Sequence, residues 1–350
     1  MKTFPLHLRG ILLPVCVLLL GLSTAFAQRP DWLQGTSKKF PAGYYLVGVG
    51  SGKTRDAAEN QARAGIAKNF KVQINATTGV VSTETLKRKD ETTTGESEEK
   101  TVSDVEVGVR KTMEGVEIAE VYEDPSTGTI HALAVLKRSK AQAILEDQIQ
   151  ELDTEIVSLG KEADEAADKI EKLRLMLRRK TLMVSREELN ADYRVVDPAS
   201  QSVPAPFSLE KERSRIASFL KNKFLVGMSA SGDESARLLQ PAMKYLSGKG
   251  ISTKKVTPAN EAAMDVIVTL ETDLDPSSEP VDDWYYCRWK LDMTATDQKT
   301  GNALVNETKS GRAGQLTPKD SRKKAVTEMT KAVGVAMESL WNTLSGEEEQ

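Results

Sequence analysis

Residues 145–180 read LEDQIQELDTEIVSLGKEADEAADKIEKLRLMLRRK, and the spacing of their apolar side chains decides the architecture of the chain. These side chains recur at alternating intervals of four and three residues, which is the pattern of a coiled-coil seam. We therefore expect one long heptad helix over residues 139–190, with a seam about 50 Å long at about 1.5 Å per residue. Its seam positions are Leu145, Ile149, Leu152, Ile156, Leu159, Ala163, Ala166, Ile170, Leu173 and Leu177.

Charge is distributed unevenly along this stretch. Acidic residues fill its first half and basic residues fill its last part, an order that suits the helix dipole. Parallel pairing of two such helices places like charges together, whereas antiparallel pairing places opposite charges together. If two chains self-associate through residues 139–186, we expect them to be antiparallel. The alternative is an amphipathic helix that lies on the chain's own domains.

Before this helix, residues 28–138 have the pattern of a small α+β domain. Alternation of apolar and polar residues predicts strands, and an alanine-rich helix is expected from Thr54 to Phe70. Residues 87–104, which are rich in Thr, Ser and Glu, should form an exposed hairpin tip or loop. The expected strands lie at 44–47 (ending at Gly48, Gly50 and Gly52), 72–74, 105–109, 116–121 and 130–136.

After the helix, a Pro/Ser-rich linker at 191–207 leads to a second domain at 208–345 and an acidic tail at 346–350. Ser208 is a helix N-cap by its residue type. The clearest strand of the chain begins at Tyr285, with apolar side chains on one face and polar ones on the other. The fold class is therefore α+β: two small domains with antiparallel-rich sheets and packed helices, joined by a long coiled-coil-like helix.

The first 27 residues have the composition of a secretory signal peptide. A basic start and an apolar run at 11–22 are followed by a small-x-small pattern at 25–27, so we expect cleavage between Ala27 and Gln28. Lipidation at Cys16 is not expected, because a lipobox needs a small residue before the cysteine and valine stands there. No later segment reaches the ~20 apolar residues of a membrane span, so we expect no transmembrane segment in the mature chain.

Composition excludes several classes of function. Without Lys2 and Arg9 of the signal peptide, 46 of the 48 basic residues face 51 acidic ones, a net charge of −5. This balance gives no electrostatic reason to expect a nucleic-acid partner. Cys287 and His131 are then the only cysteine and histidine, too few for an intrachain disulfide or a multi-histidine metal site. We expect no catalytic residues, no cofactor and no metal.

Four features could still carry chemistry. Residues 48–54, GVGSGKT, lie between a strand and a helix as a P-loop does, but they are one residue short of the Walker spacing, so we interpret them as turn glycines. We expect Cys287 to be a buried, inert thiol and His131 to be structural. A carboxylate cluster could hold calcium, although its irregular spacing favours a solvated acidic loop; its members are Asp273, Asp275, Glu279, Asp282 and Asp283.

Short motifs in the first part of the chain resemble those of a known family. They are Pro30-Asp31-Trp32, YYLVGVG at 44–50, the alanine-rich helix, GVEI at 115–118 and HALAVLKR at 131–138. Through them, residues 30–145 resemble the Lpp-twenty lipoprotein family of the bacterial cell envelope. The resemblance implies a compact α+β envelope domain with no catalytic residues to carry over. This chain departs from the family in lacking a good lipobox.

The last part of the chain is faintly similar to the α/β domains of TolB-like proteins and of the curli secretion lipoprotein. The similar features are the DVIV strand at 265–268, a strand that ends at Thr300-Gly301, and the helix that follows. This likeness is an analogy of fold and says nothing about function.

The leading hypothesis is a non-enzymatic, exported cell-envelope protein, located in the periplasm or at the periphery of the outer membrane. It would act as a scaffold or assembly factor through protein–protein contacts. The alternative is a periplasmic module that binds a small molecule or a glycan. A third hypothesis is an exported hydrolase that uses carboxylates alone.

Overall fold

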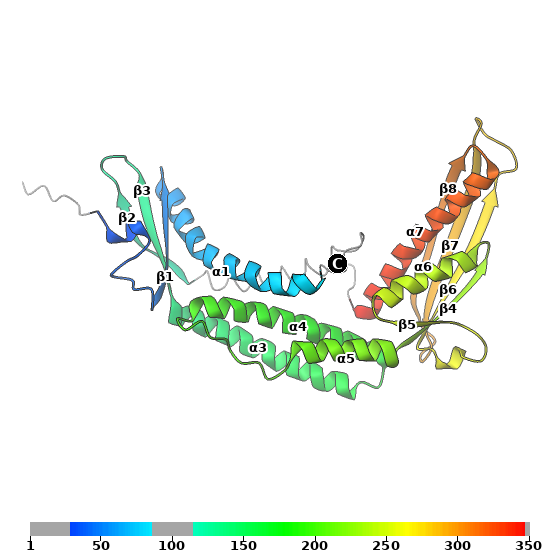
Figure 1. The fold of residues 1–350 in the computed structure, drawn as a ribbon, viewed down its shortest axis with the longest axis horizontal. Helices are drawn as coiled ribbons and strands as arrows, with labels where there is room; N and C mark the ends of the chain where they lie inside the picture. The colour runs from blue at the N-terminus through cyan, green and yellow to red at the C-terminus, as the bar shows by residue number, and fades with distance from the viewer. Residues whose placement is uncertain (1–28, 86–114, 347–350) are drawn as a thin grey trace, which may run out of the picture.

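The computed structural model describes residues 29–85 and 115–346, and for residues 71–85 it describes only the course of the backbone. The expected signal peptide with its cleavage site at Ala27 and Gln28, the cysteine Cys16, the tract 87–104 and the strand expected at 105–109 lie outside these residues. The described chain is elongated, with an α+β unit at each end and two long helices between them (Figure 1).

The N-terminal unit is a three-stranded antiparallel sheet with the order β1-β3-β2. One face is covered by α1, whose small side chains pack on β3, and the other by the N-terminal segment that contains Trp32. The elements are η1 (Asp31–Gln34), β1 (Tyr45–Gly52), α1 (Arg55–Thr85), β2 (Val116–Glu123) and β3 (Ile130–Lys137).

The strand expected at 44–47 does not end at the glycines, because β1 continues through them to Gly52. A Cβ atom at Gly48 would lie 2.2 Å from the carbonyl oxygen of Ala62, and one at Gly50 would lie 2.2 Å from that of Ala58. The glycines therefore allow the backbone of β1 to touch the backbone of α1. Their role is close packing between a strand and a helix rather than a turn.

The strand expected at Val72 and Ile74 is wrong, because α1 continues past Phe70 to Thr85. Two apolar residues at alternating positions are too few to distinguish a strand from a helix. Helix α1 also contacts α4 (Lys169–Val196), and such a tertiary contact can outweigh the low helix propensity of β-branched residues.

The single long helix expected over residues 139–190 is also wrong. The chain forms α3 (Arg138–Glu165), turns at residues 166–168, and returns antiparallel as α4. Asp168 begins α4 as its N-cap, because its side chain accepts hydrogen bonds from the backbone N–H groups of Ile170 and Glu171, both at 2.9 Å. The heptad pattern is therefore divided between the two arms of a helical hairpin.

The uneven charges pair within this hairpin. Arg178 lies 2.6 Å from Glu155, and Arg186 lies 2.9 Å from Asp153. Antiparallel pairing is thus present, but inside one chain rather than between two. Seven of the ten seam side chains are buried in the monomer, so this seam is not free to bind a second copy; they are Leu145, Ile149, Ile156, Leu159, Ala163, Ile170 and Leu173.

The C-terminal unit is a five-stranded mixed sheet with the order β5-β4-β6-β7-β8. Strand β4 is parallel to β5 and β6, while β7 is antiparallel to β6 and β8. The elements are α5 (Leu209–Asn222), β4 (Leu225–Gly232), α6 (Ser235–Gly248), β5 (Ser252–Lys255), η3 (Glu261–Ala263), β6 (Val266–Pro276), β7 (Tyr285–Asp297), β8 (Ala303–Gln315) and α7 (Pro318–Ser345).

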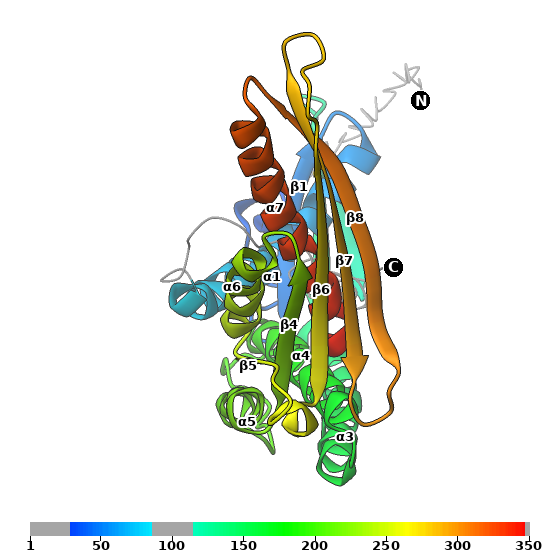
Figure 2. The ribbon, with the colours of Figure 1, turned by 90° about the vertical axis from the view of Figure 1, so that its right-hand side faces the viewer.

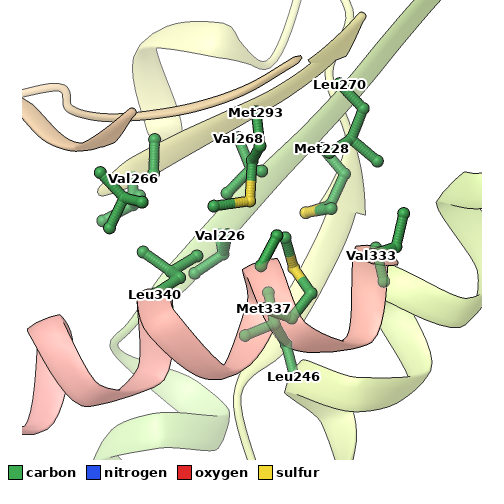
Figure 3. Packing of buried hydrophobic residues seen from close by; sticks show 14 of the residues in the cluster. Val226, Met228, Leu246, Val266, Val268, Leu270, Met293, Val333, Met337 and Leu340 are labelled. Carbon is green, nitrogen blue, oxygen red and sulfur yellow. The ribbon is translucent and has the colours of Figure 1, made fainter. Parts of the chain in front are cut away.

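The core of this unit lies between one face of the sheet and helices α6 and α7. Figure 3 shows strand residues such as Val268 and Met293 directed at Met337 and Leu340 of α7 and at Leu246 of α6. The opposite face of the sheet is turned towards the viewer in Figure 2. Within the described residues, no helix of the C-terminal unit covers the middle of this face. Each of the two units is thus a sheet whose apolar face packs against helices, as the predicted α+β fold class requires.

The helical hairpin belongs to both hydrophobic cores. Leu145 and Ile149 of α3 pack in the same buried cluster as the strands and helix of the N-terminal unit. Ile170 and Leu173 of α4 pack in the cluster of the C-terminal unit. The hairpin is therefore a shared layer of both units and not a free connector.

Candidate functional site

A tight turn forms the outer end of the C-terminal unit, where the loop from β6 reaches β7 (Figure 1). The N–H of Val281 donates to the carbonyl of Trp284 at 2.8 Å, and the N–H of Trp284 donates back at 3.0 Å. The two central residues have positive φ, 51° at Asp282 and 62° at Asp283. This is the pattern of a type I′ turn, in which Asp is one of the few tolerated side chains.

Two aromatic rings lie beside this turn, near Gly314 at the end of β8. The ring of Tyr286 lies against Gly314, where a Cβ would be 2.8 Å from it, and the ring of Trp284 reaches within 3.6 Å of the same point. The Arg312 guanidinium lies 3.6 Å from the centroid of the Tyr286 ring. The Tyr286 ring therefore occupies the space that a side chain at position 314 would fill, and the Arg312 guanidinium holds it there by a cation–π contact.

Three apolar side chains remain exposed here: Val281 is 53% exposed, Trp284 43% and Leu316 66%. Exposed apolar side chains that gather at one place mark interaction sites, and tryptophan is enriched among the residues that dominate binding energy. We call this region the tip surface and define it as Val281, Asp282, Asp283, Trp284, Tyr286 and Leu316.

Carboxylates lie within the tip surface and next to it along the chain. Asp275, Glu279, Asp282 and Asp283 are exposed, and Arg288 lies 3.7 Å from Asp275. These are members of the acidic cluster that could have held calcium. In the described part of the chain, no group of three or more His, Cys, Asp or Glu side chains is placed to hold a metal ion. The carboxylates instead give the tip surface an acidic rim.

The other residues singled out from the sequence have structural surroundings. Cys287 is buried on the inner face of β7, and burial raises the pKa of its thiol. His131 lies on β3 with its ring 6.3 Å from that of Tyr122 in a stacked arrangement. Residues 48–52 lie within β1, so the P-loop-like stretch is a strand and not a phosphate-binding loop.

A polar clamp ties the interdomain linker to α4. The fully buried Arg186 donates to both carboxylate oxygens of Asp153, at 2.9 and 3.3 Å, and to the carbonyl of Pro204 at 3.0 Å. Asn190 exchanges two hydrogen bonds with the backbone of Val203, at 2.8 and 3.3 Å. The linker is therefore fixed along the hairpin by side chains that α4 supplies.

A hollow of about 440 Å³ lies where the linker meets α4 and α5. Its polar lining comes from Arg179, which pairs with the buried Glu212, and from Arg215, which lies 2.5 Å from Asp164. The exposed Lys211 adds a third cation, and the apolar lining includes Phe207 and Met183. Cations exceed carboxylates in this lining, so the hollow suits an anionic group better than a cationic one.

One carboxyl group titrates unusually. Burial, with the neighbouring Glu188 as a smaller contribution, raises the pKa of Asp192 on α4 to about 7. A carboxyl with such a pKa is a typical acid–base catalyst when it lies in a cleft. Asp192 is only 1% exposed and lines neither this hollow nor a smaller one around Tyr193. Its position is therefore that of a packing residue.

The tip surface is not predicted by the composition of residues 279–283, which is that of a solvated acidic loop. A signal was available: VDDW at 281–284 places two turn-forming residues between strand-forming ones, which is the pattern of a two-residue hairpin. The clustering of Leu316 and Tyr286 around Trp284 depends on strand register and could not be derived from local sequence.

Comparison with protein families gives one match. Residues 30–137 match the family model of the LPP20 lipoproteins, which confirms the resemblance inferred from the motifs. A search of curated proteins finds no significant match. Among the residues that the structure describes, no helix combines the length and the hydropathy that a membrane span requires.

A comparison with solved structures also gives matches. The secreted protein HP1454 of the human pathogen Helicobacter pylori is 15% identical, with a TM-score of 0.43, over 85% of this chain and 98% of its own. Lipoprotein GNA1162 of Neisseria meningitidis is 13% identical, with a TM-score of 0.22, over 31% of this chain and 97% of its own. A minor lipoprotein of Acinetobacter baumannii is 9% identical, with a TM-score of 0.23, over 35% and 93%.

Proposed function

We propose that this chain is a non-enzymatic, exported protein of the bacterial cell envelope that acts as a scaffold or assembly factor through protein–protein contacts. The match of residues 30–137 to a lipoprotein family supports the envelope location. The observation that carries the scaffold role is the α3–α4 hairpin, which is part of both hydrophobic cores. A shared layer of this kind keeps the two units at a fixed separation, as a scaffold requires.

The tip surface is the contact surface in this proposal. It lies at the end of the C-terminal unit that is farthest from the hairpin (Figure 1). Its exposed Val281, Trp284 and Leu316 offer an apolar centre, and the carboxylates around them favour a partner protein whose apolar patch has a basic rim. Charge complementarity of this kind speeds association and selects among partners.

The surroundings of the potentially reactive groups support a non-enzymatic role. A buried thiol with a raised pKa, as at Cys287, is a poor nucleophile at neutral pH. Asp192 has an acid–base pKa but no access to solvent. His131 lies on the N-terminal unit, where its ring packs against that of Tyr122.

Site-specific photo-crosslinking in the native envelope tests this proposal. A photoreactive amino acid in place of Val281 should give a discrete adduct with one partner protein. Val335 on α7 is the matched control position, because it is also a valine and is also 53% exposed. The Trp284→Ser change, introduced together with the probe at position 281, should abolish the adduct without lowering the melting temperature by more than a few degrees.

Equal labelling from positions 281 and 335, or no adduct at either, would contradict the assignment of the tip surface. An adduct that persists with Trp284→Ser would show that the aromatic ring does not contribute. Turnover of an envelope metabolite by the purified chain would contradict the non-enzymatic part of the proposal.

The hollow beside α5 favours a second candidate function, that of a module which binds a small anionic molecule. Its lining combines Arg179, Lys211 and Arg215 with the ring of Phe207. Because a ligand of the native state raises the melting temperature, a thermal-shift screen of anionic sugars and small phosphates tests this candidate. A shift that disappears in Lys211→Ala would support it, and the absence of any shift would remove it.

A further inference from the structure

Strand β8 is one of the two edge strands of the C-terminal sheet, and it is far longer than the other, β5. It is thirteen residues long, as long as β7, and pairs with β7 on one side only. In Figure 2 it runs along the outer side of the sheet, and within the described residues no other strand continues the sheet beyond it. An edge of this length presents a row of unpaired backbone donors and acceptors, which is a template for another strand.

The middle of this edge carries charges on the inner face of the sheet. Val305 and Ala313 are buried beneath the helices, and Glu307 and Lys309 share their face by the two-residue period of a strand. The Lys309 Nζ lies 3.3 Å from the Glu307 carboxylate. Inward-pointing charges discourage pairing with an ordinary apolar strand, because that strand would bury them.

We propose that β8 pairs antiparallel with β8 of a second copy of this chain, about a two-fold axis at Thr308. In this register Glu307 of one copy lies opposite Lys309 of the other, and Lys309 lies opposite Glu307. The charges that repel a foreign strand thus become two reciprocal ion pairs. Opposite charges at directly opposed positions stabilise a strand pair, so the sequence around Thr308 is complementary to itself.

The geometry is consistent with a continuous sheet. A two-fold axis perpendicular to the sheet keeps the helix layers of both copies on one side. Next to the axis the outer-face residues are small and polar, and Asn306 lies opposite Ser310 of the other copy. The interface is isologous and closes at two copies, as a two-fold axis requires. This inference does not depend on the proposed partner at the tip surface.

Cysteine crosslinking of the chain from Gln28 onward tests the register. Thr308 is exposed, and its Cβ would lie about 5 Å from its counterpart across the axis, so Thr308→Cys should form a disulfide-linked dimer under mild oxidation. Asn306→Cys and Ser310→Cys are matched controls on the same face. Each of these positions is four residues out of register with its counterpart in the other copy, about 13 Å along the strands. Both variants should therefore remain monomeric on a non-reducing gel. The native Cys287 is buried and should not contribute.

Charge reversal gives an independent measurement by analytical ultracentrifugation at tens of micromolar. Lys309→Glu places two carboxylates together twice across the axis and should weaken dimerisation roughly tenfold or more. The double change Glu307→Lys with Lys309→Glu restores both reciprocal pairs and should restore the dimer. Melting curves of all variants establish that they fold.

Three results would overturn the proposal. They are a monomeric wild-type chain at these concentrations, equal crosslinking at 306, 308 and 310, and a charge-swapped variant that remains as weak as the single variant. Preferential crosslinking at 308 together with rescue by the double change would support it.

Discussion

At the scale of single residues, the contact between β1 and α1 depends on the absence of side chains. The alanine-rich face of this helix predicts a close approach to a sheet, and the structure confirms it, since Ala58 and Ala62 are buried against the sheet. The matching feature on the strand is the pair Gly48 and Gly50, whose sequence context between a strand and a helix predicts turn glycines instead. Their role follows from tertiary distances and could not be obtained from local pattern alone.

Gly50→Ala should lower the free energy of unfolding by about 3 kcal/mol, because overpacking against a backbone cannot be relieved by a rotamer change. The new Cβ would lie 2.2 Å from both the Ala58 oxygen and the Ala62 nitrogen. Gly43→Ala is the control, since no atom lies within 4 Å of its Cβ position, and it should change stability by less than about 0.5 kcal/mol. Urea denaturation measures both, and equal effects would contradict the packing role.

Asp192 should make the chain less stable as pH rises. The pKa of this carboxyl is about 7 in the folded chain and about 3.9 when unfolded, so the folded state binds the proton more tightly. The contribution of Asp192 to the free energy of unfolding is then most favourable below about pH 4, and it becomes steadily less favourable as pH increases towards 7.

Asp192→Asn keeps a neutral side chain at every pH and should remove this loss. Relative to wild type, the variant should gain about 4 kcal/mol at pH 8, from a shift of about three pKa units at about 1.4 kcal/mol each, and almost nothing at pH 4. Melting temperatures measured across this range test the prediction, with the exposed Asp147→Asn as control. Parallel curves for wild type and Asp192→Asn would contradict it.

At the scale of elements, the helical hairpin shows what a periodic pattern can and cannot predict. The seam continues in phase from Ala163 through Ala166 to Ile170, so spacing alone gave no sign of a reversal. A local signal was present, because Asp168 with Glu171 three residues later is a helix-start pattern. The charge order favours antiparallel pairing if two chains associate, and the structure shows antiparallel pairing between two helices of one chain. Proximity within one chain makes the intramolecular pairing far easier to form.

Asp168→Ala should lower the free energy of unfolding by about 1 kcal/mol, because the N–H groups of Ile170 and Glu171 lose their acceptor. The side chain also lies 3.5 Å from Lys299, so the loss extends to the C-terminal unit. Asp168→Asn retains a capping oxygen and should cost only a few tenths of a kcal/mol. Chemical denaturation of the two variants should rank them in this order, and equal stabilities would contradict the capping role.

At the scale of the whole molecule, the sequence predicted α+β units on either side of a helical segment, with the linker and the C-terminal strands close to their observed places. The relation between the units could not be predicted. It depends on contacts between residues far apart in the chain, such as Leu145 with the N-terminal core and Leu173 with the C-terminal core. The linker clamp at Arg186 is of the same kind, since its partners are Asp153 and Pro204.

The central claim is that the shared hairpin holds the two units as one body. Spin labels at Ser126→Cys in the β2–β3 turn and Ser278→Cys beyond β6 would report their separation, because both sites are exposed and Cys287 is buried. Pulsed electron–electron double resonance at low protein concentration should give a single narrow distance distribution. A broad or multimodal distribution, as expected for two domains on a flexible connector, would contradict the account.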